Sequence, residues 1–403
     1  YQSQCKKPKI IRDAITETHQ GLVDQGFMVK RKDLPNDIKN MINEAGFLHY
    51  MPWHIAVKEG SLSTPYRMVV DASMTGLNEI LAKGENRMTK ITDILIRNRC
   101  NKYIWSSDIS KLYNQLKLNP SAMPWGLFLF KDGLDIDAEP EEYVMKVAWY
   151  GVSSTGNQAH EALQTLTKEQ NIDYPEALKI IEKDLYVDDV LTGTNDYDLT
   201  TSQIDQTALA LGNGGFKLKY IVRSGEKPCI EASADSSSLK VLGYKWSPEK
   251  DILQPGFSEI NFNKRKKGLK KPNMSPIITP KDVTDVVKNL KLTRRIVASK
   301  VAEIWDPTGL WEPFKLQLKL DCQALKGLDW DTELDNDLQG IWTERFRQFL
   351  DVPQMFTRRC IVPHDAVDPN NLRLVCISDA GKEAGGCAIY GGFLRQNGTY
   401  SSS

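Results

Sequence analysis

The sequence has no excess of charge of either sign, since its 403 residues hold 52 Lys+Arg and 52 Asp+Glu side chains. This balance excludes a histone-like polycation and an acidic disordered chain. Nucleic-acid binding stays open, but it would have to come from local basic patches. No apolar run approaches the roughly 18 residues needed to cross a bilayer, so we expect no membrane partner.

Cysteine and histidine are too few and too scattered to indicate a metal site or a disulfide framework. The seven cysteines are odd in number and include no Cys-x-x-Cys pair, and the five histidines lack metal-ligand spacing. We therefore expect reduced thiols in an intracellular protein and structural histidines. The chain opens with neither an initiator Met nor an apolar leader, which favours an excised fragment or mature product over a secreted precursor.

The chain is too long for one ordinary core and shows no internal repeat, so two or more domains are expected. Hydrophobic periodicity predicts helices at about 10–21, 156–170 and 197–211, the last ending at Gly212. Pro175 is expected at the first position of another helix. The predicted strands are 47–57 in a hairpin with 66–70, 103–109 followed by a short helical turn, 125–130, 143–148, and 216–221 paired with 240–246.

The amino-acid composition of the sequence changes after Trp246. Residues 247–280 are rich in Pro, Gly, Asn and Lys, and helices are predicted from there to Leu350. Two strands, Leu372–Asp379 and Gly386–Tyr390, come near the end and cannot bury a core by themselves, so the last domain is predicted to be truncated. The last helix is expected to bury one stripe: Leu334, Leu338, Ile341, Trp342, Phe346 and Phe349.

The strongest chemical signal is Tyr186-Val187-Asp188-Asp189, two adjacent acids between short apolar strands. Adjacent carboxylates repel each other and lose solvation in such a place unless a cation neutralises them. Hard oxygen ligands suit Mg²⁺, which shares carboxylates with substrate phosphates. The alternative is a solvated hairpin tip that happens to contain two acids.

A second acid, Asp108, ends an apolar strand well before this hairpin. Alone, it would more often be a helix cap than a metal ligand. An aromatic follows it at Tyr113, then a Gly-Ser-rich turn at 151–156, then the two acids of the hairpin. That ordered set is typical of the palm of a nucleotidyl-transferring polymerase.

These motifs make the chain similar to reverse transcriptases, and more narrowly to those of Bel/Pao-type long-terminal-repeat retrotransposons. The resemblance covers nearly the whole chain, and its order and spacing are more specific than any single piece. Its motifs are Tyr66–Ser73 with Leu77-Asn78, Ser107–Gln115, Tyr150–Ser154, Tyr186–Asp189, Gly214–Tyr220, Val241–Trp246, Trp305–Pro313 and Cys376–Gly381. The proline usual after the 150–154 turn is replaced, with Gly156 about there.

The resemblance implies an α+β right-hand polymerase with an antiparallel palm sheet. Residues 1–246 would form interleaved fingers and palm, 247–352 a mostly helical thumb and connector, and 353–403 a linker with a truncated ribonuclease H-like α/β segment. Asp379 would be the first metal acid of that segment. The remaining acids would lie beyond Ser403, so the chain as given is not expected to cleave RNA.

The resemblance also implies roles in the polymerase site. Asp108, Asp188 and Asp189 would be catalytic and hold two Mg²⁺ ions, for which Mn²⁺ is a substitute. Tyr113 would exclude a ribose 2′-hydroxyl, its alternative being a core aromatic, and Lys219 would protonate pyrophosphate, its alternative being a surface lysine. The other expected nucleotide contacts are Arg67, Lys58, the backbone amides of Lys111 and Leu112, and Tyr150.

The expected partners are an RNA or DNA template with its primer and deoxynucleoside triphosphates, with a homodimer as one option. Template and duplex contacts are predicted at Gly151, Tyr186, Arg294 and Arg295. The basic cluster 264–271 is either a phosphate-tracking loop or a solvated one. Cytoplasm, a virus-like particle or the nucleus is the expected location. A catalytically silent binding subunit or domesticated remnant is the main rival, and an RNA-templated RNA polymerase is disfavoured by Tyr113 and the ribonuclease H strand.

Overall fold

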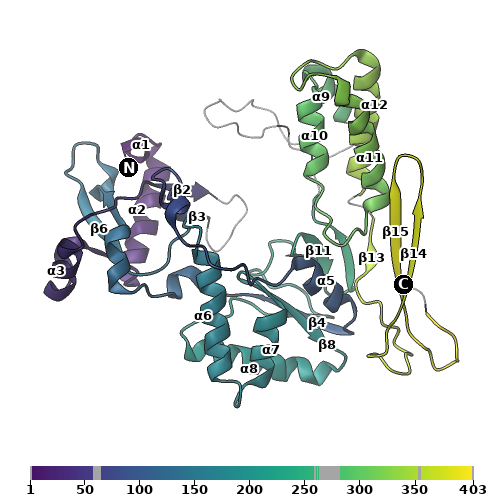
Figure 1. The fold of residues 1–403 in the computed structure, drawn as a ribbon, viewed down its shortest axis with the longest axis horizontal. Helices are drawn as coiled ribbons and strands as arrows, with labels where there is room; N and C mark the ends of the chain where they lie inside the picture. The colour runs from purple at the N-terminus through teal and green to yellow at the C-terminus, as the bar shows by residue number, and fades with distance from the viewer. Residues whose placement is uncertain are drawn as a thin grey trace. The chain divides into compact units, whose positions relative to one another are not determined.

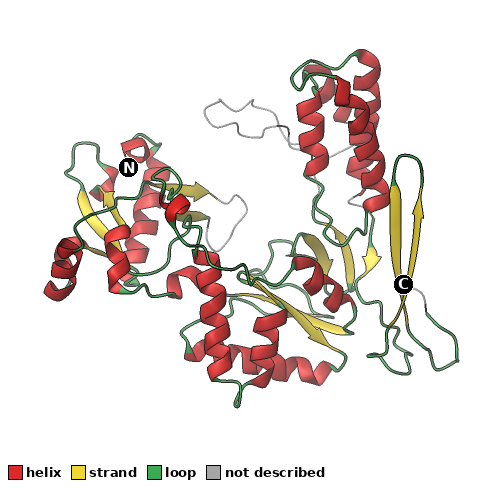
Figure 2. Cartoon of the chain, viewed as in Figure 1, coloured by secondary structure: helices red, strands yellow, loops and turns green. Residues whose placement is uncertain are grey.

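The structure, a computed structural model, describes residues 2–57, 65–257, 260, 262, 282–352 and 355–401 as a mixture of helices and mostly antiparallel strand pairs (Figures 1 and 2). These residues form two compact units. The first consists of Tyr1–Thr89, Ser107–Val190 and Thr201–Ile221, and the second of Lys90–Ser106, Leu191–Thr200 and Val222–Ser403. The three-part domain division expected from the sequence stays a prediction. No helix in the described ranges has the length and apolar character that a membrane crossing requires.

The first unit contains a three-stranded sheet in the order β1-β6-β5 and the hairpin β2-β3. Its strands are β1 (Met28–Lys30), β2 (Trp53–Val57), β3 (Tyr66–Val70), β5 (Leu127–Phe130), β6 (Glu141–Met145) and β7 (Leu185–Tyr186). Its helices are α1 (Gln2–Cys5), α2 (Lys9–Asp24), α3 (Asn36–Glu44), α4 (Leu77–Ile80), α6 (Thr155–Glu169) and α7 (Pro175–Lys183), with short 3₁₀ turns at Arg31–Asp33, Leu112–Gln115, Pro120–Trp125 and Asp132–Leu134.

The core of this unit lies where α2 meets the sheets. Ile15 of α2 is buried in the same apolar cluster as Trp53, Phe130 and Met145. His19, one turn further along α2, stacks on Phe130 with 3.6 Å between ring centroids, and burial lowers its pKa to about 4. A neutral, packed imidazole agrees with the structural role expected from the sequence.

Two strands have their two ends in different units. They are β4 (Tyr103–Asp108) and β8 (Asp189–Thr194). They belong to a four-stranded sheet in the order β7-β8-β4-β9, where β9 is Val222–Arg223. Residues 104–107 of β4, which include Ser106 and Ser107, are all buried. Helix α8 (Tyr197–Asn213) also begins in the second unit and continues into the first.

The second unit joins a four-stranded sheet in the order β10-β11-β12-β13 to a helical cluster. Val297, Leu318, Trp342 and Phe346 form the centre of the helical core. The elements of this unit are α5 (Ile91–Arg99), β10 (Leu239–Val241), β11 (Tyr244–Ser247), β12 (Ile252–Pro255), α9 (Val283–Asn289), α10 (Arg294–Ala302), α11 (Glu312–Ala324), a 3₁₀ turn at Leu325–Gly327, α12 (Asn336–Asp351), β13 (Thr357–Arg358), β14 (Arg373–Ala380) and β15 (Gly385–Gly392).

Most elements expected from the sequence are confirmed. Helix α7 begins at Pro175, β2 pairs antiparallel with β3, and β4 is followed by the 3₁₀ turn at Leu112–Gln115. Strands β14 and β15 form an isolated antiparallel hairpin, and every residue of β14 is exposed. This agrees with the expectation that two strands bury no core of their own.

Four local expectations are wrong. Strand β2 begins at Trp53, so residues 47–52 are not part of it. Helix α8 runs through Gly212, and the left-handed glycine follows it at Gly215. Residues 240–246 pair among themselves as the β10-β11 hairpin rather than with 216–221. Ile341 is exposed because the buried stripe of α12 is narrower than its apolar pattern.

A buried ion pair ties β13 to the turn before β12 in the second unit. The Arg359 side chain is 2% exposed and donates from Nε and Nη2 to the two carboxylate oxygens of Asp251, each at 2.6 Å. It also donates to the backbone carbonyls of Asn101 and Lys102. With Asp251 removed, a buried guanidinium would lose its counter-charge.

We therefore expect Asp251→Ala to cost about 3–5 kcal/mol, as breaking a buried pair does, and to lower the melting temperature clearly. Asp331→Ala is the matched control, since Asp331 forms a two-point pair with the exposed Arg295. Exposed pairs contribute little, so this control should melt near the wild-type temperature. Equal melting temperatures for the two variants would contradict the structural role of the Arg359 pair.

Candidate active site

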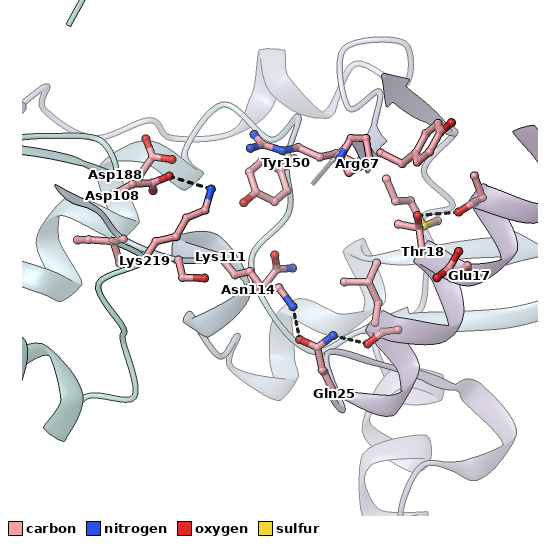
Figure 3. A pocket seen from close by; sticks show the side chains of 18 of the residues that line it. Glu17, Thr18, Gln25, Arg67, Asp108, Lys111, Asn114, Tyr150, Asp188 and Lys219 are labelled. Carbon is pink, nitrogen blue, oxygen red and sulfur yellow. Dashed lines mark hydrogen bonds and ion pairs between the residues drawn. The ribbon is translucent and has the colours of Figure 1, made fainter. Parts of the chain in front are cut away.

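A cavity of about 600 Å³ in the first unit gathers residues from six separate stretches of sequence (Figure 3). Residues of α2, of β3 and of the segment after β4 line the cavity, together with Met145 of β6, Tyr150, Asp188 and Lys219. Its wall includes Asp108, Asp188, Lys219, Arg67 and Tyr150. The sequence predicted each of these five side chains as a site residue, and the structure brings them to one cavity.

The two acids are brought together by the backbone. Asp108 ends β4, and the amide of the next residue, Ile109, donates to the Asp188 carbonyl at 2.8 Å. Asp188 lies in the two-residue turn between Tyr186 and Asp189, which are register partners. Val187, the other turn residue, has φ of 57°, a left-handed conformation that β-branched residues rarely adopt. Such a strained position is typical of functional sites.

Asp189, the third acid predicted to bind metal, is placed differently from Asp108 and Asp188. Asp189 begins β8 and is half-buried, but the cavity wall, as far as the chain is described, includes only Asp108 and Asp188 of the three. Within the described ranges, no group of three His, Cys, Asp or Glu side chains is gathered so that it could hold a metal ion. The two cavity carboxylates are hard oxygen donors and fit Mg²⁺ in their chemistry.

A lysine lies beside the first acid. Lys219 Nζ is 3.8 Å from Asp108 Oδ2, and the Lys219 amide donates to the Asp108 carbonyl at 2.8 Å. A second backbone bond, from Ser110 to the Lys217 carbonyl at 2.8 Å, fixes the same segment. The ammonium therefore faces a carboxylate from a position that the backbone determines.

The side chains of Arg67, Tyr150 and Tyr113 lie against one another, with Tyr150 in contact with the other two. The Arg67 guanidinium carbon lies 5.8 Å from the Tyr150 ring centroid, within cation–π range, and the Tyr113 centroid lies 4.9 Å from that of Tyr150. Burial raises the pKa of Tyr150 to about 12, against the lowering effect of Arg67. Burial also raises the pKa of Tyr113, helped by the charge of Asp188. Both phenols stay protonated at neutral pH.

The sequence missed the contribution of α2. Lys111, which lines the cavity and has φ of 50°, donates from Nζ to Gln25 Oε1 at 2.6 Å. The sequence did contain a sign of this contribution, because small and polar residues recur every four positions along α2 and so lie on one face of the helix. Leu112, predicted to present its amide beside Lys111, is a buried residue. The residues on the cavity wall from α2 and the residue that follows it are Ala14, Glu17, Thr18, Gly21, Leu22 and Gln25.

The remaining predicted contacts lie elsewhere. Arg294 donates to the Lys326 and Leu328 carbonyls and lies 4.1 Å from the Trp330 ring, and Arg295 pairs with Asp331. Asp379 is exposed on β14. Lys58 and the basic cluster 264–271 lie outside the described residues. Gly151 is exposed next to Tyr150, and Tyr186 is half-buried next to Val187.

Comparison with known proteins finds one family match and similar solved structures. Residues 293–403 match the family described as the Pao retrotransposon-like RNaseH-like domain. No curated protein matches the chain. A solved structure of a foamy viral protease-reverse transcriptase dRH, in complex with double-stranded DNA, is similar with a TM-score of 0.53 and 13% identity, over 94% of this chain and 53% of that one.

The chain thus spans about half the length of that solved protein, and at this identity the likeness establishes the fold alone. The family match begins at Thr293, just before α10, and includes the hairpin β14-β15 that carries Asp379. The chain is therefore a mixed helix and sheet protein whose fold is similar to part of that solved structure, and its residues 293–403 are similar to the Pao retrotransposon-like RNaseH-like domain.

Proposed function

We propose that this chain is the reverse transcriptase of a Bel/Pao-type retrotransposon, an RNA- and DNA-templated DNA polymerase that adds deoxynucleotides to a primer 3′-hydroxyl. The placement of Asp108 and Asp188 on one cavity wall, fixed by the Ile109–Asp188 backbone bond, carries this proposal. Under this proposal, residues 1–246 supply the interleaved fingers and palm, and residues 247–352, which include helices α9 to α12, supply the thumb and connector. An intracellular location and a template–primer partner follow from the same proposal.

The residues of the cavity suit the charge that develops in nucleotidyl transfer. The primer hydroxyl attacks the α-phosphorus, and pyrophosphate leaves with added negative charge. Arg67 offers a planar guanidinium with several donors for the triphosphate oxygens. Lys219, whose ammonium lies 3.8 Å from Asp108 Oδ2, would give a proton to the leaving pyrophosphate. Tyr113, whose ring packs against that of Tyr150, would exclude a ribose 2′-hydroxyl.

The two cavity carboxylates are the residues that would hold Mg²⁺, with Asp189 as the third ligand expected from the sequence. When bound, the ions would lower the pKa of the primer hydroxyl and neutralise charge on the phosphates. Asp108 and Asp188 contribute the negative charge and the fixed backbone positions that such binding needs. Mn²⁺ is the proposed substitute.

The rival is a catalytically silent subunit that binds nucleic acid without extending a primer. A primer-extension assay with Mg²⁺ on a simple RNA template separates the two proposals. Product of increasing length supports the polymerase, and binding without extension supports the silent subunit.

We expect Asp188→Asn to abolish extension while the affinity for primer–template stays within a few-fold of wild type. The amide keeps the shape of the side chain but removes a charge that stabilises the transition state, which costs several kcal/mol in comparable sites. Single-turnover extension and an equilibrium binding titration measure the two quantities.

Asp173→Asn is the matched control, because Asp173 is exposed in the turn between α6 and α7. It should extend primers at the wild-type rate. Near-normal synthesis by Asp188→Asn would remove the carboxylate from the proposed mechanism.

Replacing both Arg294 and Arg295 with Ala tests the proposed duplex contact. If both side chains contact phosphates, the slope of log affinity against log salt should fall by roughly 0.9 for each arginine. The structure gives these guanidiniums partners within the chain, namely the Lys326 and Leu328 carbonyls and Asp331. An unchanged slope together with a lower melting temperature would assign them to those internal contacts instead.

A further inference from the structure

Two cysteines meet on the hairpin β14-β15, which Figure 1 shows as a two-stranded ribbon. The Cys376 sulfur on β14 lies 3.2 Å from the Cys387 sulfur on β15. Both side chains are exposed, and both thiols are free. The contact therefore places two oxidisable groups within reach of each other and of small molecules in solution.

The register of the hairpin places both sulfurs on one face. Cys376 pairs with Ile389 and Cys387 pairs with Ser378, so the two cysteines are diagonal neighbours. Alternate residues of a strand share a face, and so do directly opposed residues, which puts Cys387 on the same side as Cys376. Asp379, one residue after Ser378, belongs to the opposite face. The sulfurs and the Asp379 carboxylate therefore do not compete for space.

A bond between the two sulfurs requires only a small movement. The sulfur–sulfur distance in a disulfide is about 2.05 Å, so the two atoms would approach each other by about 1.2 Å. Diagonal pairs are commonly wider than direct ones, but two-stranded ribbons twist more strongly than larger sheets, which shortens one diagonal. Every residue of β14 is exposed, so the strand can adjust without disturbing a core.

The two thiols differ in how they hold a proton. The hydrogen bond between the sulfurs raises the pKa of the Cys387 thiol, so Cys387 keeps its proton and donates it to the Cys376 sulfur. When the pair loses one proton, the charge therefore lies on Cys376. A thiolate rather than a thiol attacks a disulfide, which makes Cys376 the first nucleophile and Cys387 the second.

We propose that Cys376 and Cys387 form a modification site for low-molecular-weight disulfides such as glutathione disulfide, which convert the pair to an internal disulfide. The Cys376 thiolate attacks one sulfur of glutathione disulfide, which forms a mixed disulfide on Cys376 and releases one glutathione thiolate. Cys387 then loses its proton, attacks the Cys376 sulfur and expels the second glutathione thiolate. The two released thiolates take up the two protons that the cysteines lose. Two protein thiols are oxidised, and glutathione disulfide is reduced to two glutathione molecules.

The internal disulfide changes how firmly the hairpin is held. A hairpin of two strands is marginally stable by itself, and the exposed strand β14 gains little from packing. A covalent link between the strands keeps Asp379 opposite Gly386, its register partner. The oxidation state of the two sulfurs therefore sets how readily β14 separates from β15. This role goes beyond the proposed polymerase function and uses none of its residues.

The test is incubation of the full chain with glutathione disulfide, followed by digestion and mass spectrometry under non-reducing conditions. Wild type should contain the internal Cys376–Cys387 disulfide in roughly tenfold or greater excess over glutathione adducts at these residues, because the second thiol is already in contact with the first. Cys387→Ser should keep glutathione on Cys376, and Cys376→Ser should keep it on Cys387. Glutathione adducts at both positions of wild type, or a disulfide that joins two copies of the chain, would overturn the proposal.

Cys229 is the matched control within the same chain, since its side chain is exposed and its sulfur makes no hydrogen bond to a described residue. It should gain one glutathione and form no internal disulfide. The variant Cys229→Ser should leave the Cys376–Cys387 disulfide unchanged. Internal disulfides that include Cys229 as often as the hairpin cysteines would show indiscriminate pairing and would contradict a built site.

Hydrogen exchange tests the effect on the hairpin without an activity assay. Backbone amides of β14 and β15 should exchange about tenfold more slowly in oxidised than in reduced wild type, because the link opposes separation of the strands. The variants Cys376→Ser and Cys387→Ser should exchange equally under both conditions, and the amides of α12 serve as the internal reference. Equal exchange in oxidised and reduced wild type would refute the control of the hairpin by the two sulfurs.

Discussion

Backbone hydrogen bonds from the segment around Asp108 hold together the stretches that carry the candidate active site. The Ile109 amide donates to Asp188, the Ser110 amide donates to Lys217, and the Asp108 carbonyl accepts from Lys219. These bonds join residues that are far apart in the sequence, and they use only groups that every non-proline residue has. The relative position of the two carboxylates is therefore set by the sheet and its continuation, while side chains determine what the cavity binds.

Local structure was predictable because local chemistry specifies it. Helix α7 begins at Pro175 because the missing amide of proline costs nothing at the first helical position. The acid-containing segment 185–191 folds as two short strands because its apolar residues flank a polar turn. Asp108, Asp188, Lys219, Arg67 and Tyr150 were all identified from motif order. The structure places all five on the wall of one cavity.

Long-range packing was not predictable. Residues 240–246 make a hairpin of their own because Leu242 and Gly243 take positive φ angles of 45° and 94° and reverse the chain, a choice that strand propensity does not reveal. The resemblance implied that Tyr113 lies near the nucleotide, but it could not show that the Tyr113 ring packs against Tyr150, a residue of the cavity wall. Likewise, the basic character of Arg294 and Arg295 was evident, whereas their acceptors at Lys326, Leu328 and Asp331 depend on how the helices pack.

The left-handed Val187 has a consequence for how the acid beside it behaves. A non-glycine residue in such a conformation stores on the order of 1–3 kcal/mol, which persists only while the surrounding structure enforces it. Here β7 and β8 enforce it, through the register pairs Leu185–Val190 and Tyr186–Asp189. The backbone strain at Val187 is therefore maintained by the pairing of two short strands. Loss of that pairing would relieve the strain, so heat or denaturant should displace the Asp188 carboxylate before the helices around it melt.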